Sequence, residues 1–126
     1  MRTPLAISEH AVGDVTVLAL SGRLVYDDGD REFRDRVTSL VKSGRTRFLV
    51  DLEDVTYIDS AGVGTLVAML LHVVRRGGDL KLLHPSERAG RVLETAQLLT
   101  VFDVFDTEAQ AISAPSPAVP GRPPKS

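Results

Sequence analysis

A strand, a helix and a second strand follow one another between residues 47 and 84, and this order limits the fold more than any other feature. Residues 47–52 include the apolar run FLV, which is typical of a strand buried on both faces. A helical pattern then continues to about Arg76, Gly77-Gly78 ends it, and the strand DLKLLH follows. This order predicts a right-handed crossover between parallel strands. We therefore expect an α/β fold whose sheet is centred on residues 47–52.

The flanking segments supply the rest of the sheet and its cover. The stretch LAISEHAVGDVTVLALSGRL alternates apolar and polar residues around Val12-Gly13-Asp14, which predicts an antiparallel hairpin. DDGDREFRDRVTSLVKSG carries apolar residues at helical spacing and acidic residues at its front. Towards the end come a helix, SERAGRVLETAQL, with Ser86 as its N-cap, a short segment VFDVF and a helical turn EAQAI. These patterns predict one mixed β-sheet with an N-terminal hairpin and helices packed mainly on one face.

Composition indicates the domain organisation and excludes some classes of function. The 126 residues suffice for one domain, which we expect at residues 4–112, and the proline-rich stretch 113–126 predicts a disordered tail. The net charge is −2 without a basic cluster, which argues against direct binding of nucleic acid. The longest apolar run, residues 66–71, is far shorter than the roughly 20 residues that span a bilayer, and the polar N-terminus does not resemble a signal peptide. A cytoplasmic protein that does not bind membranes is expected.

The junction IDSAGVG, residues 58–64, is unusual because a glycine inside a helix costs about 1 kcal/mol relative to alanine. A nucleotide-binding loop would explain glycines there, but the third glycine of the dinucleotide fingerprint and a Gly-Lys-Ser/Thr are both missing. A nucleophile elbow needs glycine where Ile58 stands. The histidines, at positions 10, 72 and 84, belong to no motif that would place them beside Ser60. We therefore expect neither an enzyme nor a protein with a cofactor or metal.

Two interpretations of the junction remain open. In the first, Asp59 or Ser60 caps the helix and the glycines let it pack closely on the sheet. In the second, the first turn is small and open because another protein approaches its backbone. Helical spacing predicts one stripe towards the sheet, made of Val63, Leu66, Val67, Leu70, Leu71 and Val74. Met69 and Val73 lie off that stripe with Thr65, and we expect them to be partly exposed, where a methionine suits adaptable protein contacts.

The string VDLEDVTYIDSAGVGTLV resembles the hallmark of the STAS-domain anti-sigma factor antagonists. In that family an apolar strand ends in Asp-Leu and is followed by D-S-(S/T/A)-G-(L/V)-G at the start of a helix. The resemblance extends from LSGRL through GGDLKLLHPS to LLTVFDVFDTEAQAI, or about residues 5–112. Where the family commonly has Asp directly after G-x-L, this chain has Val25, and Asp27 and Asp28 follow later.

The resemblance implies a phosphorylation switch rather than an enzyme. It implies that Ser60 is phosphorylated by an anti-sigma factor that is also a serine kinase, and that a PP2C-like phosphatase reverses this. Unphosphorylated antagonist would bind the anti-sigma factor and release the sigma factor, and phosphorylated antagonist would not bind. Alternatives are a STAS module of a stressosome-like scaffold or of a lipid-transporter complex, and a small-ligand or nucleotide-binding domain. The predicted partner-binding residues are Asp27, Asp59, Ala61, Gly62, Val63, Gly64, Thr65 and Met69.

Overall fold

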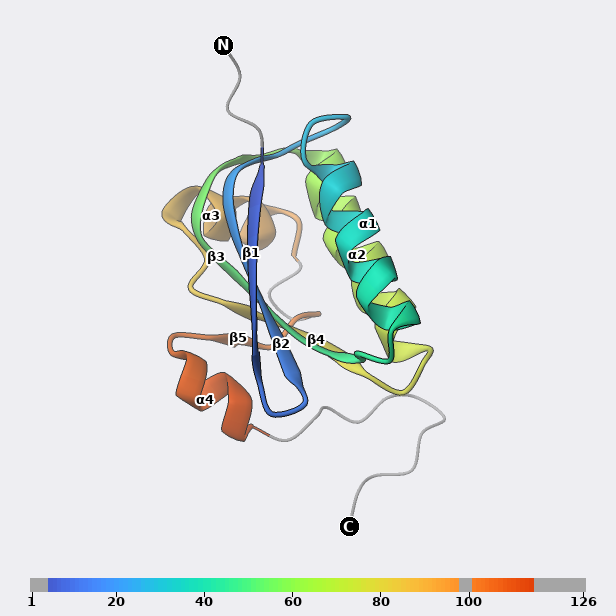
Figure 1. Ribbon diagram of the computed structural model, residues 1–126. Coiled ribbons are helices and arrows are strands. Elements are labelled where there is room, and N and C mark those ends of the chain that lie inside the picture. The colour runs from blue at the N-terminus through green and yellow to red at the C-terminus, as the bar shows by residue number, and fades with distance from the viewer. Residues whose placement is uncertain (1–4, 98–100, 115–126) are drawn as a thin grey trace.

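Five strands form one mixed sheet in the order β1-β2-β3-β4-β5 (Figure 1). The computed structural model describes residues 5–97 and 101–114. The strands are β1 (Ala6–Val12), β2 (Val15–Leu24), β3 (Arg47–Ile58), β4 (Asp79–Leu83) and β5 (Val104–Phe105). β1 and β2 form the antiparallel hairpin, and the other neighbours pair in parallel. The predicted hairpin, the parallel crossover and the central position of β3 are therefore confirmed.

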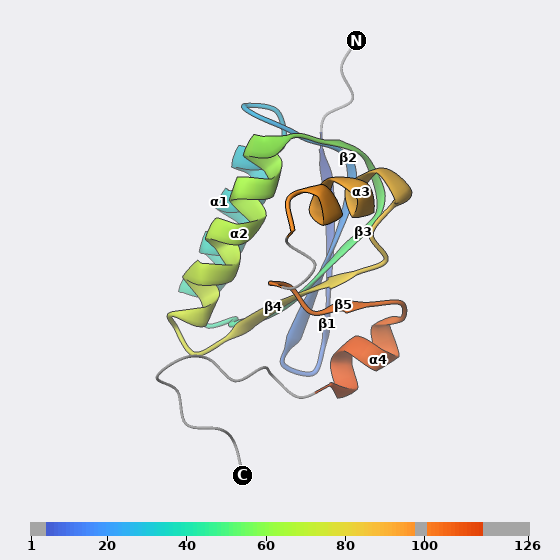
Figure 2. The same ribbon diagram turned by 180° about the vertical axis from the view of Figure 1, so that it is seen from behind.

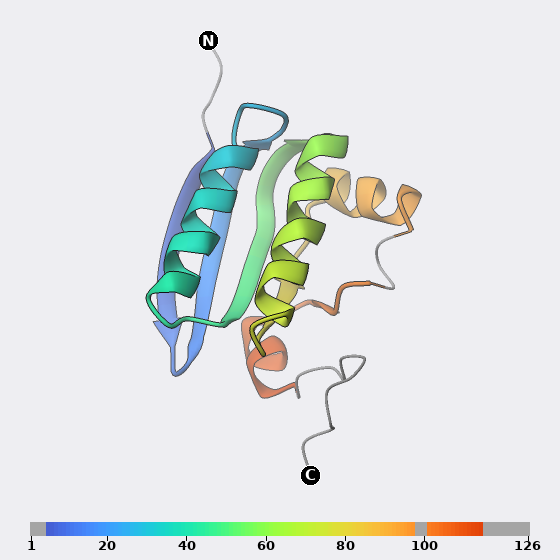
Figure 3. The same cartoon turned by 90° about the vertical axis from the view of Figure 1, so that its right-hand side faces the viewer.

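In the described part of the chain, three helices cover one face of the sheet and a fourth covers part of the other. They are α1 (Asp30–Lys42), α2 (Ser60–Val74), α3 (Glu87–Thr95) and α4 (Glu108–Ser113). Figure 3 shows α1 and α2 side by side in front of the sheet, with α3 beyond the first turns of α2. Buried residues of α1, α2 and α3 share one core cluster, whereas Ala111 of α4 belongs to a separate cluster on the opposite face. The helices thus pack mainly on one face, as the sequence predicts.

The buried apolar residues alternate along the central strand because successive side chains of a strand point to opposite faces. Phe48, Val50 and Leu52 of β3 belong to the larger core under α1, α2 and α3. Leu49 belongs to the smaller core under α4. Burial on both faces of β3 explains its near-continuous apolar run.

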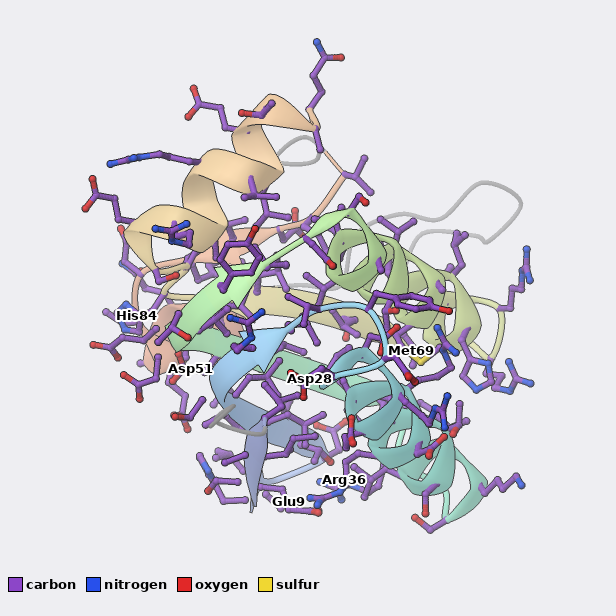
Figure 4. The ribbon with its side chains drawn as sticks, turned by 90° about the horizontal axis from the view of Figure 1, so that it is seen from above. Glu9, Asp28, Arg36, Asp51, Met69 and His84 are labelled. Carbon is purple, nitrogen blue, oxygen red and sulfur yellow. The ribbon has the colours of Figure 1, made fainter. Side chains whose placement is uncertain are left out.

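An ion pair links α1 to the edge of the sheet. Arg36 Nη1 of α1 lies 2.8 Å from Glu9 Oε1 of β1 (Figure 4).

β3 is longer than the predicted strand 47–52 and runs to Ile58. It pairs with β2 along almost its whole length, with register shifts between Ala19 and Ser21 and between Gly22 and Arg23. At the end of this pairing Leu24 lies opposite Ile58. The loop after β2 and the start of α2 therefore lie side by side, at the carboxyl ends of the two strands.

The predicted orientation of α2 is wrong on one flank. Met69 is 5% exposed and Val73 is 0% exposed, whereas Leu71, which was expected to face the sheet, is 46% exposed. The reason is α1, which packs beside α2 and covers the flank that carries Met69. Figure 4 shows Met69 between the two helices. Helical spacing defines which residues share a face but does not say which neighbouring element covers it.

The predicted proline-rich tail, 113–126, lies outside the described residues except for Ser113, which ends α4, and Ala114.

Candidate functional site

Asp59 joins the end of β3 to the start of α2 and also holds the loop after β2. Its backbone is extended, and its Oδ1 accepts a hydrogen bond from the Gly62 amide at 2.9 Å, which makes it the N-cap of α2. Its other oxygen, Oδ2, accepts a hydrogen bond from the Tyr26 amide at 3.1 Å. One carboxylate therefore fixes the helix start relative to a loop that lies 33 residues earlier in the chain.

Ser60 is the first residue of α2, and its side chain is exposed. Because Asp59 supplies the cap, the helix does not need the Ser60 hydroxyl for this purpose. Within residues 5–97 and 101–114 that hydroxyl makes no hydrogen bond. The first turn thus presents a serine whose oxygen is accessible and whose modification would leave the capping bond in place.

The two glycines of the junction have different roles. Gly62 is buried, and a Cβ atom there would lie 2.0 Å from the Leu24 carbonyl oxygen and 3.0 Å from Ile58 Cγ1. Gly64 is exposed, and a Cβ atom there would meet nothing within 4 Å. The expectation of an open backbone is therefore wrong for Gly62, which is needed for close packing on β2, and correct for Gly64.

The loop between β2 and α1 is folded back on itself. The Val25 amide donates to the Asp28 carbonyl at 3.2 Å, and the Asp28 amide donates to the Val25 carbonyl at 3.1 Å. The Val25 side chain is buried, so the apolar residue at this position points into the core. Asp27 lies at the tip with φ +54° and pairs with Arg31 at 2.8 Å. Tyr26, beside it, is 75% exposed.

A hollow of about 370 Å³, here called the α1–α2 hollow, lies between this loop and the two helices. It is lined by Tyr26, Asp27, Asp30, Arg31, Arg34, Ala61, Gly64 and Thr65. The structure therefore brings together four of the predicted contact residues from two distant segments. Thr65 is itself buried, and its hydroxyl accepts a hydrogen bond from Arg34 Nη2 at 3.3 Å. Sequence reasoning missed Tyr26 and both arginines, although an aromatic residue in the polar stretch VYDDGD was a usable signal.

A second hollow of about 350 Å³, the α2–α3 hollow, lies on the other side of the start of α2. It is lined by Ser60, Val63, Arg91, Val92, Thr95 and Ala96. Figure 2 shows α3 beside the first turns of α2. Ser60 is the predicted phosphorylation site and Val63 a predicted contact residue, whereas the α3 residues were not predicted. The first turns of α2 are thus bordered by two hollows of different chemistry, one polar and charged and one largely apolar.

The histidines lie away from both hollows. His10 Nε2 is 3.2 Å from Glu108 Oε1, and His84 follows the end of β4. His72 lies in the last turn of α2, where partial burial and the adjacent Arg76 and Arg75 lower the pKa of its imidazole. None of the three histidines lines the hollow that contains Ser60.

Two further properties concern only the residues that the structure describes. Among them, no group of three or more His, Cys, Asp or Glu residues could hold a metal ion. No helix within the same ranges is long and apolar enough to cross a membrane.

Comparison with known families assigns the fold. The STAS domain family model matches residues 7–111. The chain belongs to the STAS domain family. A candidate anti-sigma factor antagonist of Thermotoga neapolitana is 30% identical to this STAS domain over 101 residues, which is 80% of this chain and 89% of the relative. The anti-sigma-B factor antagonist of Bacillus subtilis is 34% identical over 71 residues, or 56% of this chain and 64% of the relative.

Solved structures agree with this assignment. The crystal structure of a candidate anti-sigma factor antagonist from Thermotoga maritima matches with a TM-score of 0.78 and 27% identity. The match covers 84% of this STAS domain chain and 91% of that protein. The sheet and its helices therefore have the arrangement of a STAS domain.

Proposed function

We propose that this STAS domain is a cytoplasmic anti-sigma factor antagonist that is switched by phosphorylation of Ser60. Its unphosphorylated form binds an anti-sigma factor with serine kinase activity, and the sigma factor is released. The observation that carries the proposal is the accessible Ser60 hydroxyl on a helix that Asp59 already caps. The antagonist names of its relatives from Thermotoga and Bacillus support it further.

The covalent step takes place between the partner's ATP and Ser60. The Ser60 Oγ attacks the γ-phosphorus, the bond to the β-γ bridging oxygen breaks, and the products are phosphoserine and ADP. The hydroxyl proton passes to a base of the kinase, because this domain offers no histidine beside Ser60. A PP2C-like phosphatase returns the serine by hydrolysis. The domain is the substrate of both reactions and catalyses neither.

The proposed contact surface consists of residues around the start of α2 that are exposed or, for Ala61, partly exposed. Tyr26 and Asp27 come from the β2–α1 loop, and Ser60, Ala61 and Gly64 come from α2. The buried members of the predicted set act through the scaffold: Gly62 seats the helix, and Thr65 and Met69 pack it towards α1. Asp59 sets the position of Tyr26 through the hydrogen bond to its amide. Val63 borders the α2–α3 hollow.

Phosphorylation would end binding by a local effect. A phosphoserine adds a charge of about −1.5 to −2, which a helix N-terminus tolerates. The phosphate would stand next to the Asp59 carboxylate and close to Ala61 and Gly64, so that it adds both negative charge and bulk to the contact surface. The fold itself would persist, because the capping bond from Gly62 to Asp59 does not involve Ser60.

The test is to incubate the domain with a kinase-fold anti-sigma factor encoded beside it and ATP, and to measure intact mass. Wild type and Ser39→Ala should each gain one phosphate, whereas Ser60→Ala should gain none. Ser39 is a suitable control because it is an exposed serine on α1. A phosphate on Ser60→Ala, or none on wild type with a kinase that is active on another substrate, would contradict the proposal.

A further inference from the structure

Arg91 of α3 borders the same hollow as Ser60. The α2–α3 hollow has Ser60 and Val63 on one side and Arg91, Val92 and neighbouring residues of α3 on the other. Among the described residues that line this hollow, Arg91 carries the positive charge, and the others have short or apolar side chains. Figures 2 and 3 agree that α3 lies beside the start of α2.

The Arg91 guanidinium is available for a new partner. Its present partner is Glu87, one turn earlier on α3, and the two side chains are 73% and 81% exposed. A solvated pair at this spacing contributes little to stability. A phosphate dianion accepts two parallel hydrogen bonds from a guanidinium and carries more charge than a carboxylate, so it would compete well against Glu87.

Other arginines near the site are held in different directions. The guanidinium groups of Arg88 and Arg23 lie 5.4 Å and 5.1 Å from the centre of the Tyr57 ring. Arg31 pairs with Asp27, and Arg34 donates to Thr65, both in the α1–α2 hollow. Arg91 therefore combines a weak existing pair with a position across the hollow from Ser60.

We propose, building on the phosphorylation of Ser60 proposed above, that the Arg91 guanidinium forms an intramolecular ion pair with the Ser60 phosphate and donates hydrogen bonds to its oxygens. The ion pair bridges α2 and α3 across the α2–α3 hollow and replaces the pair with Glu87. It thereby covers the apolar lining that Val63 and Val92 present in the unphosphorylated form. Phosphorylation thus closes one flank of the site as well as adding charge to it.

The test measures the second pKa of the phosphate by ³¹P NMR in protein carrying phosphoserine at position 60, incorporated during translation. A phosphoserine ordinarily has this pKa near 6, and a bound guanidinium lowers it because it favours the dianion. We expect the pKa in Arg91→Gln to be higher than in wild type by about half a unit or more. The matched control is Arg88→Gln, which removes the same charge from the same helix and should leave the pKa within about 0.2 units of wild type.

Two results would overturn the proposal. One is an equal phosphate pKa in wild type and Arg91→Gln, which would mean that no contact forms. The other is an equal rise in Arg91→Gln and Arg88→Gln, which would reflect the general field of α3 rather than a specific pair. Because the phosphate is installed without a kinase, a failure here is distinct from a failure of Ser60 phosphorylation. Arg91 is exposed, and an unchanged melting temperature of unphosphorylated Arg91→Gln would verify that the fold is intact.

Discussion

Replacing Gly62 with alanine should destabilise the domain, whereas the same change at Gly64 should not. Both glycines lie in the first turns of α2, two residues apart, so the intrinsic helix propensity of the substitution is similar at both sites. Their surroundings differ. At Gly62 the new methyl group would lie 2.0 Å from the Leu24 carbonyl oxygen, and at Gly64 it would meet nothing within 4 Å.

The magnitude follows from this contact. Carbon and carbonyl oxygen normally approach no closer than about 3.3 Å, so the 2.0 Å contact would force α2 and the end of β2 apart by about 1.3 Å. Overpacking of this kind costs about 1–3 kcal/mol, and a rigid backbone neighbour favours the upper end. Helix propensity returns up to about 1 kcal/mol. We expect Gly62→Ala to lose about 2 kcal/mol and Gly64→Ala to gain about 0.5 kcal/mol.

Urea unfolding followed by far-ultraviolet circular dichroism measures both variants against wild type. A loss of about 2 kcal/mol corresponds to a fall of about 10 °C in melting temperature for a domain of this size. The slope of free energy against urea should be unchanged, because the buried area hardly differs. If Gly62→Ala unfolds within about 0.5 kcal/mol of wild type, the close approach to Leu24 does not limit the packing of α2. A comparable loss in Gly64→Ala would show that helix geometry, rather than this contact, is responsible.

Three further predictions concern the surroundings of Ser60 and the far end of α2. Asp59→Ala should lower stability by about 1–2 kcal/mol in thermal unfolding, because the Gly62 and Tyr26 amides both lose their acceptor. An unchanged melting temperature would contradict the role of Asp59 as the helix cap. Tyr26→Ala should weaken binding to the anti-sigma factor at least about tenfold in calorimetric titration while stability changes by less than about 0.5 kcal/mol; equal affinities would remove Tyr26 from the contact surface. His72 has its pKa lowered by partial burial and by Arg76, so the unfolded state binds the proton more readily. The melting temperature of wild type should therefore fall relative to that of His72→Gln as the pH decreases below about 6.5. Melting temperatures that change in parallel for the two proteins between about pH 7.5 and 5 would refute this.

Local signals in the sequence were sufficient for most of the fold. The hairpin and the Ser86 cap of α3 were predicted correctly, because each depends on residues a few positions apart. The parallel crossover was also predicted correctly, because the order strand, helix, strand implies it. The exposure of Met69 was predicted wrongly, because α1 covers the flank that helical spacing left unassigned. The position of Tyr26 beside the start of α2 was missed, because it depends on a hydrogen bond to Asp59 across 33 residues.

The sequence by itself determined the elements of this STAS domain, the capped junction at the start of α2 and the serine that the junction presents. These features follow from the spacing of apolar residues along the sequence and from hydrogen bonds within one helical turn. Only the tertiary structure decided that Gly62 is buried while Gly64 is open, and that the β2–α1 loop and Arg91 of α3 border the same helix start. Those relations depend on the parallel pairing that sets Leu24 beside Ile58, and on the packing of α3 beside α2. Contacts between segments so far apart in the chain leave no periodic signal within either segment.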